Sequence, residues 1–595
     1  ASTVTSVAIF LPVLFMEGME GQLFQDLALT LAVSVSASFL VAVTVLPVAS
    51  SYFLRAEDKD PCRHWWSRIT GWVMHLTRTP LLCRSWIVAI LGGSILAIVL
   101  LTPKANLLPQ APSDSLNAFF NMPPGGTVDM LKTEIAGEIV QRLKPYMDHE
   151  KQPYIRGYNL SAFGTFNALF IYPLDPNRIE EMIELVRNEV LVDLPDTQAF
   201  VSRSSLLNFG FDGGRSINVD IQGSDIEALA EVAVQGMRVI NETIPGAQVR
   251  PIPGLEVAEP ELQLVPIDRR ITAAGLDRAA VANIVRAMTS GSFVGEYFDG
   301  NDRMDIILRG PTWRSPEELA DIPIATPLAG IQTLGELTEI RRTVGPTQLL
   351  RVDGQRTLTL SVTPPDEMTV QEALDILRDD AGPRLKELLP ADVSLQYRGT
   401  ADRLDEAFAQ MGTNLVLATV ILFFILAAMF RSLRDSLLVL LAMPLAVAGG
   451  IIALRLMNLV TRQSMDLLTM IGFIILLGLV VNNAILLVMQ TRSGQGEGLD
   501  RSAAVAEAVR LRARPIYMST LTSIFGMLPL MVIPGVGSQI YRGLATVIIG
   551  GMVLSGIFTL ILLPAILRLP PLGLLRKLRG LPEKLVDKQG VPADA

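Results

Sequence analysis

The chain has 595 residues, of which 50% are apolar and 18% are charged, and its formal net charge is −9. The length exceeds that of one ordinary domain, and the apolar share with a positive mean hydropathy is typical of a protein that lies partly in lipid. The acidic balance gives no support to nucleic-acid binding. No P-loop, nucleophile elbow or metal-ligand spacing indicates an enzyme or a bound cofactor.

The chain opens with an apolar segment over Thr3–Phe15 and a predicted membrane helix over Leu23–Leu54. No initiator Met or basic leader precedes this apolar run, so we expect an N-terminus cut inside a larger protein. The loop Arg55–Arg84 is basic and contains three Trp, which favours a helix lying in the membrane interface. A third span is predicted over Trp86–Leu101.

A polar, proline-rich stretch then predicts a soluble α+β body. The order strand, helix, strand, strand, helix, strand is predicted between Asn117 and Ser204, as in a split βαβ unit. The same order recurs between Ser216 and Arg398, interrupted by an insertion with its own helices and a hairpin through Gly295–Arg309. The fold class is therefore an α-helical membrane bundle plus ferredoxin-like α+β units.

Five more spans follow, at Asn414–Phe430, Ser436–Leu456, Leu467–Gln490, Pro515–Ile533 and Tyr541–Leu567. Lys and Arg gather in alternate loops, so the positive-inside rule places these loops and the C-terminus in the cytoplasm. The soluble body then lies on the opposite side, which is the periplasm of a Gram-negative cell.

The span Met470–Gln490 carries no charge but has two adjacent amides, Asn482 and Asn483. Polar side chains at this depth are costly, so they usually face other helices or a wet cavity rather than lipid. The plainer alternative is that the two amides only hold helices together.

An internal repeat relates Ser2–Pro47 to Ser519–Pro564 at a constant offset, with about a dozen identities. Both copies start at the predicted cytoplasmic side, so the repeat is parallel. The offset predicts that the complete protein begins roughly 430 residues before Ala1, with a matching first half.

These features resemble the resistance–nodulation–division efflux permeases, of the type that exports hydrophobic and amphiphilic compounds. The motifs that carry the resemblance are GLVVNNAIL (Gly478–Leu486), RARPIYMSTLTS (Arg512–Ser523), AMPLAVAGG (Ala442–Gly450) and LVPIDRRITAAGL (Leu264–Leu276). The resemblance implies a homotrimer in the bacterial inner membrane, driven by protons, with a periplasmic adaptor protein and an outer-membrane channel. It also implies small-molecule substrates and a missing N-terminal half.

The family's organisation divides the chain into eight expected units. They are spans five and six at 1–54, a cytoplasmic or interfacial loop at 55–84, span seven at 85–101, a first periplasmic porter subdomain at 102–213, a second at 214–258 and 348–410, a docking subdomain at 259–347, spans eight to twelve at 411–567, and a cytoplasmic tail at 568–595.

The resemblance also implies a proton relay. In the family, two carboxylates on the fourth span, which is absent here, bind the proton. Asn482 stands where drug pumps often have Lys, and Asn483, Ser519 and Arg512 match relay positions. Buried carboxylates bind protons readily when neighbours hydrogen-bond them. For Ser519, a hydrogen bond to the backbone of its own helix is an equally good interpretation. For Arg512, a role as a positive-inside anchor is favoured over a role in the relay.

A substrate pocket is predicted at two aromatic clusters, because aromatic area binds apolar ligands without fixed geometry. The candidates are Tyr158, Phe163, Phe166, Phe170, Phe209 and Phe211. The alternative is core packing, which is favoured for Phe170.

Two other functions stay open. A metal-exporting branch of the family uses methionines, and this chain offers Met122, Met130, Met147 and Met182, although their spacing follows helix faces. The second alternative is a split or incomplete half-transporter that has no activity on its own.

Overall fold

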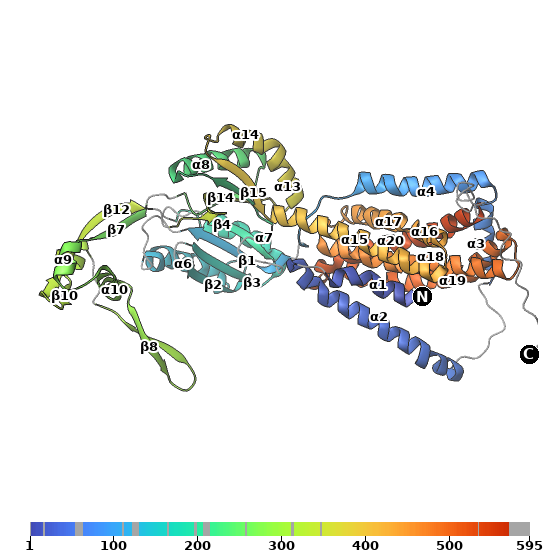
Figure 1. Ribbon diagram of the computed structural model, residues 1–595, viewed down its shortest axis with the longest axis horizontal. Helices are drawn as coiled ribbons and strands as arrows, with labels where there is room; N and C mark the ends of the chain where they lie inside the picture. The colour runs from blue at the N-terminus through green and yellow to red at the C-terminus, as the bar shows by residue number, and fades with distance from the viewer. Residues whose placement is uncertain are drawn as a thin grey trace, which may run out of the picture.

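The computed structural model describes residues 2–15, 18–53, 63–109, 112–121, 130–163, 166–194, 199–205, 215–255, 259–310, 315–345, 348–533 and 535–569. The molecule is elongated: long helices form one end, two α+β units form the middle, and a smaller body stands at the other end (Figure 1). The predicted fold class, a helical membrane bundle with α+β units, is confirmed.

Seven spans in the described part are long and apolar enough to cross a membrane. They comprise α2 (Gly18–Phe53), α4 (Pro80–Leu101), α15 (Thr400–Phe430), the consecutive helices α16 (Leu433–Leu440) and α17 (Met443–Met457), α18 (Leu467–Gly496), α19 (Arg501–Val532) and α20 (Val536–Arg568). The helix α3 (Arg63–Leu76) packs against α19 and α20, where Trp66 stacks on Tyr517.

The helices differ from the sequence prediction at several places; α19, for example, begins at Arg501, whereas its span was predicted to start at Pro515. The first predicted span is α1 (Ser2–Leu14), whose 13 residues reach only about 20 Å, short of the ~30 Å hydrocarbon layer. The predicted span Ser436–Leu456 is two helices, because Pro444 lacks the N–H that would continue the hydrogen-bond ladder. Helix α15 begins at Thr400, inside the stretch predicted as soluble.

Helices α17 and α20 approach each other closely enough for their backbones to meet. A Cβ built on Gly550 would lie 2.2 Å from the Cβ of Ala453 and 2.6 Å from the carbonyl oxygen of Gly449. Small residues at such crossings let helices pack without side chains between them. This contact holds α20 against α17, and α18 lies alongside both helices.

The first α+β unit is an antiparallel sheet with strand order β2-β3-β1-β4. Its elements in chain order are β1 (Pro112–Asn121), η1 (Leu131–Ile135), α6 (Ala136–Met147), β2 (Ile155–Phe163), β3 (Phe166–Pro173), η2 (Pro176–Arg178), α7 (Ile179–Leu185), η3 (Val186–Val190) and β4 (Ala199–Ser205). Alternate residues of β1, such as Leu116 and Phe120, enter the core against the helices, and Phe119 lies on the other face.

The second α+β unit repeats this order with strands β6-β14-β5-β15. Its elements are β5 (Ile217–Gln222), α8 (Ile226–Thr243), β6 (Gln248–Ile252), β13 (Arg351–Val352), β14 (Gln355–Thr363), α13 (Val370–Ile376), η4 (Leu377–Ala381), α14 (Gly382–Glu387) and β15 (Ser394–Gly399). Both units therefore have the predicted strand and helix order.

The insertion stands away from the sheets on a two-stranded ribbon, β7 (Glu259–Pro266) with β12 (Thr338–Gly345), as Figure 1 shows. Its other elements are α9 (Asp268–Ala273), α10 (Arg278–Thr289), β8 (Ser292–Phe298), β9 (Arg303–Leu308), α11 (Pro316–Ala320), β10 (Pro323–Thr326), β11 (Gly330–Thr333) and α12 (Leu334–Leu337). The predicted hairpin is β8–β9. Sequence reasoning did not identify the ribbon.

The continuous chain and one buried side chain are two of the connections that join the bundle to the second α+β unit. Strand β15 passes into α15 at Gly399, whose φ of +79° favours glycine. The side chain of Asn106 forms the other connection: its Oδ1 accepts from the Val370 backbone N–H at 2.8 Å, and its Nδ2 donates to Ser464 Oγ at 2.8 Å.

Candidate functional site

The amide pair lies in the most enclosed of the seven spans. Helix α18 packs against α1, α15, α16, α17, α19 and α20. Asn483 is buried, with 5% of its surface exposed, and Asn482 is partly buried. Neither amide therefore lies open on the surface of the bundle.

Ser519 of α19 reaches the amide of Asn483 on α18. Its Oγ lies 3.4 Å from Asn483 Oδ1 and 2.9 Å from the carbonyl oxygen of Ile516. The single hydroxyl proton therefore has two acceptors, one on α18 and one in its own helix. This geometry suits a hydroxyl that switches partners, and it also fits the backbone-bonding alternative.

Asn482 presents an unused acceptor. Its Oδ1 is buried and has no hydrogen-bond partner among the described residues. Gly478 lies one turn earlier on the same helix face, and a Cβ there would meet Ile9 of α1. A buried acceptor without a partner costs about 1–3 kcal/mol, so a hydrogen-bond donor from outside the described residues would stabilise this oxygen.

Arg512 lies apart from the amide pair. Its Nη2 donates to Gln490 Oε1 at 2.9 Å. Seven residues separate Arg512 from Ser519, which is about 10 Å along α19. The structure thus brings Asn483 and Ser519 together and places Arg512 nearer the end of α18.

A buried carboxyl group at the start of α18 was missed. Asp466 is fully buried and caps the helix: its Oδ1 accepts from the Thr469 N–H at 2.8 Å and from Thr469 Oγ1 at 2.7 Å. Burial raises the pKa of Asp466 to about 6, against the hydrogen bonds from Thr469, which lower the pKa. Its position as an acidic cap ahead of an apolar run was the sequence signal.

Replacing Asp466 by Asn is expected to keep the helix cap, because Asn is an equally good cap residue, and to remove one ionisation near pH 6. Carboxyl-band infrared titration of the purified protein measures this change. The matched control is Asp500→Asn, an exposed cap of α19. The pH window from 5 to 7 extends about 1 unit on either side of the pKa. If Asp466→Asn titrates like the natural protein in this window, the assignment of this ionisation to Asp466 is wrong.

A cleft lies where the edge strands of the two sheets meet. Gln248 of β6 donates to the carbonyl oxygen of Val201 of β4 at 3.2 Å across this seam. The cavity beside it measures about 360 Å³. Its charged and aromatic lining residues are Phe119, Glu180, Glu184, Arg187, Phe200, Arg203, Arg215, Arg250 and Asp366.

The cleft is more basic than acidic, with four Arg against three carboxylates. Arg215 pairs with Asp366 and also donates to the carbonyl oxygens of Pro365 and Met368, at 3.1 and 2.7 Å. Burial lowers the pKa of Arg215, partly offset by Asp366. No Met, His or Cys lines this cleft in the described part of the chain.

The predicted aromatic pocket residues lie in different places. Phe170 packs edge-to-face on Phe119, with ring centroids 6.4 Å apart, whereas Tyr158 packs against the core of the first unit. Phe163 and Phe166 pair in register across β2 and β3. Phe209 and Phe211 lie outside the described residues. The aromatic lining residues Phe119 and Phe200 were missed, although strand alternation was the available signal.

The candidate methionines do not form a described metal site. Met182 is fully buried in the core of the first unit, and Met147 packs against that core. Met122 lies outside the described residues. Among the described residues, no group of three or more His, Cys, Asp or Glu side chains is arranged to hold a metal ion.

Comparison with known proteins adds a family match. The model of the AcrB/AcrD/AcrF family matches residues 1–569. The cobalt-zinc-cadmium resistance protein CzcA of Cupriavidus metallidurans is 27% identical over 94% of this chain and 54% of the relative. The nickel and cobalt resistance protein CnrA of the same organism is 25% identical over 97% of this chain and 54% of the relative.

A solved structure shares the fold. The crystal structure of a heavy metal efflux pump, crystal form I, superposes with a TM-score of 0.71 at 22% identity, covering 96% of this chain and 57% of that chain. The chain thus spans about half the length of the curated relatives that it matches.

Proposed function

This chain belongs to the AcrB/AcrD/AcrF family of resistance–nodulation–division transporters, and we propose on that premise that it forms half of a proton-driven efflux permease. A transporter family agrees with the prediction that the chain is not an enzyme. The proposed location is the bacterial inner membrane, with the two α+β units and the insertion in the periplasm.

One observation carries the proton-driven part of the proposal. The most enclosed span presents a buried amide oxygen without a described partner, at Asn482, beside an amide that Ser519 reaches from α19. Such a site is ready to hydrogen-bond a carboxyl group that gains and loses a proton. The carboxyl group would come from the part of the pump outside this chain. We therefore do not propose that this chain exports substrates on its own.

Metal cations are the first substrate class that we propose. The named relatives confer resistance to cobalt, zinc, cadmium and nickel, and the solved relative is a heavy metal efflux pump. These relatives favour the metal-exporting branch over the expected hydrophobe and amphiphile branch, and they give no support to multidrug specificity.

Organic compounds are a second candidate because of the cleft. Its lining offers two aromatic rings and an excess of guanidinium groups, without the soft ligands that suit copper(I) or the ligand cluster that suits zinc. Guanidinium groups repel free cations and attract anionic or amphiphilic organic molecules. A homotrimer, a periplasmic adaptor and an outer-membrane channel are proposed for either substrate class.

Growth tests separate the two substrate classes. Deleting the natural gene is expected to sensitise cells to Co²⁺, Ni²⁺, Zn²⁺ or Cd²⁺ if metals are exported, and to amphiphilic organic compounds if the cleft sets the substrate. Sensitivity to neither class would contradict the efflux proposal.

Chromosomal Phe119→Ala tests the cleft directly. If organic compounds pass through it, losing one aromatic wall is expected to lower resistance by roughly twofold to tenfold for some compounds and little for others, because an aromatic contact contributes about 0.5–1.5 kcal/mol. Metal resistance stays unchanged. Phe298→Ala, on the exposed hairpin of the insertion, is the matched control. Equal effects of both variants would argue against a substrate role for the cleft.

A further inference from the structure

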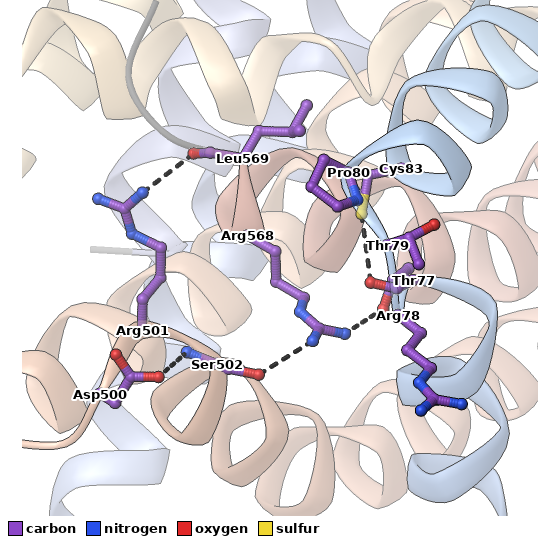
Figure 2. A pocket seen from close by; sticks show the side chains of 10 residues that line it. All are labelled: Thr77, Arg78, Thr79, Pro80, Cys83, Asp500, Arg501, Ser502, Arg568 and Leu569. Carbon is purple, nitrogen blue, oxygen red and sulfur yellow. Dashed lines mark hydrogen bonds between the residues drawn. The ribbon is translucent and has the colours of Figure 1, made fainter.

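A second cavity lies at the end of the bundle away from the α+β units. It measures about 220 Å³ and is formed where the turn between α3 and α4 meets the start of α19 and the end of α20. It is lined by Thr77, Arg78, Thr79, Pro80, Cys83, Asp500, Arg501, Ser502, Arg568 and Leu569, as Figure 2 shows. Drug-sized ligands occupy roughly 300–1,000 Å³, so this space suits a smaller chemical group.

Arg568 stands in the middle of this cavity, between the α3–α4 turn and α19 (Figure 2). Its Nη1 donates to Thr77 Oγ1 at 3.0 Å and its Nη2 to Ser502 Oγ at 3.0 Å. Its Nη1 also donates to the carbonyl oxygen of Met74 at 3.3 Å, so all three partners are neutral, and no carboxylate among the described residues forms an ion pair with this guanidinium. A partly buried cation held only by neutral groups keeps its full charge available to an anion.

Two further arginines flank the cavity. Arg501 donates to the carbonyl oxygen of Leu569 at 3.2 Å, and neither it nor Arg78 forms an ion pair within the described part of the chain. The one acidic lining residue, Asp500, caps α19 by accepting from the Ser502 N–H at 3.2 Å. Three guanidinium groups against one carboxylate leave two positive charges uncompensated.

The side chains around this cavity are of the kinds that gather at the level of lipid headgroups. Helix α3 ends one residue before the cavity and exposes Trp65 and Trp72, the residue type that gathers at membrane interfaces. Leu81 and Leu82, in the first turn of α4, are exposed and apolar, which suits contact with lipid chains at the edge of the cavity. The cavity therefore offers hydroxyl and guanidinium donors, and exposed apolar side chains lie next to it.

We propose that this cavity binds a phosphate-bearing anion, and that its source is the headgroup of an anionic phospholipid. Phosphate oxygens accept from several guanidinium and hydroxyl donors at once. Basic pockets between membrane helices on the cytoplasmic side bind such headgroups. The bound headgroup joins the α3–α4 turn, α19 and α20, because their residues supply the donors together.

Native mass spectrometry of the natural protein in detergent tests the proposal. Phosphatidylglycerol is compared with zwitterionic phosphatidylcholine, and inorganic phosphate is added as a competitor. Arg568→Gln and Arg501→Gln are each expected to lower phosphatidylglycerol binding by about fivefold. Arg510→Gln removes the same charge from the same helix as Arg501 but outside the cavity, where Arg510 pairs with Glu507, and is expected to change binding less than about twofold.

The outcomes are distinguishable. Selective phosphatidylglycerol binding that inorganic phosphate does not displace supports the lipid source, and displacement by inorganic phosphate overturns that source in favour of a free phosphate. Equal retention of both lipids by all variants overturns the site. Thermal unfolding of each variant is measured alongside. The Arg501 side chain makes one hydrogen bond among the described residues, to the carbonyl oxygen of Leu569, so Arg501→Gln is expected to fold normally and to show the loss of binding alone.

Discussion

Replacing Asn482 by Leu is expected to abolish export while the protein still inserts into the membrane. The change removes the buried amide oxygen that has no described partner, and with it the hydrogen bond that we propose for a protonated carboxyl group. Resistance should fall to the level of the deletion strain, a loss of at least about 100-fold if the relay is broken. The measurement is growth of cells carrying the chromosomal substitution, with membrane abundance followed by immunoblot.

Asn414→Leu is the matched control for this experiment. Asn414 is also an amide within a membrane span, and its Nδ2 is also buried without a described partner, but it lies on α15. It is expected to keep most of the resistance. Unchanged resistance in Asn482→Leu, or an equal loss in both variants, would show that the amide only contributes to helix packing.

Replacing Gly550 by Leu is expected to separate α17 from α20 and to lower the free energy of unfolding by about 3 kcal/mol, the upper end of the usual cost of overpacking. Gly449 contributes backbone at this crossing, where the carbonyl oxygen would lie 2.6 Å from any Cβ on residue 550. Backbone cannot rotate away as a flexible side chain would. Thermal unfolding of the purified protein, followed by Trp fluorescence, measures the loss.

Gly526→Leu provides the comparison. Gly526 also lies in a membrane helix, α19, but a Cβ there would meet nothing within 4 Å. This variant is expected to unfold within about 1 kcal/mol of the natural protein. If Gly550→Leu were equally stable, the close approach of the two helices would not contribute to the bundle.

Hydrophobic patterning predicted most of the fold because membrane spans and split βαβ units both produce strong local signals. The run around Asn482 is long and uncharged, and its helix is α18. The two sheets begin and end within about five residues of the predicted ranges: the second, predicted between Ser216 and Arg398, runs from Ile217 to Gly399. The break at Pro444 was also readable, since proline removes a hydrogen bond from a continuous helix.

The site was less predictable because it depends on contacts between distant segments. Ser519 meets Asn483 only when α19 packs on α18, and the basic cleft forms only when Val201 and Gln248 meet across two sheets. In the ribbon, β7 from Glu259 pairs with β12 from Thr338. Local sequence patterns do not encode pairing between strands so far apart in the chain. The substrate class depends on such contacts and was not fixed by the motifs.

The passage from β15 into α15 carries a mechanical consequence. The helix runs without a break for 31 residues, about 46 Å, from the edge of the second sheet into the bundle. A stiff rod of this kind transmits torque: if α15 turns where it touches α18, the strand at its other end must turn too, with Gly399 as the pivot. Under the proposed function, a rotation of α15 within the bundle would therefore also move the second α+β unit.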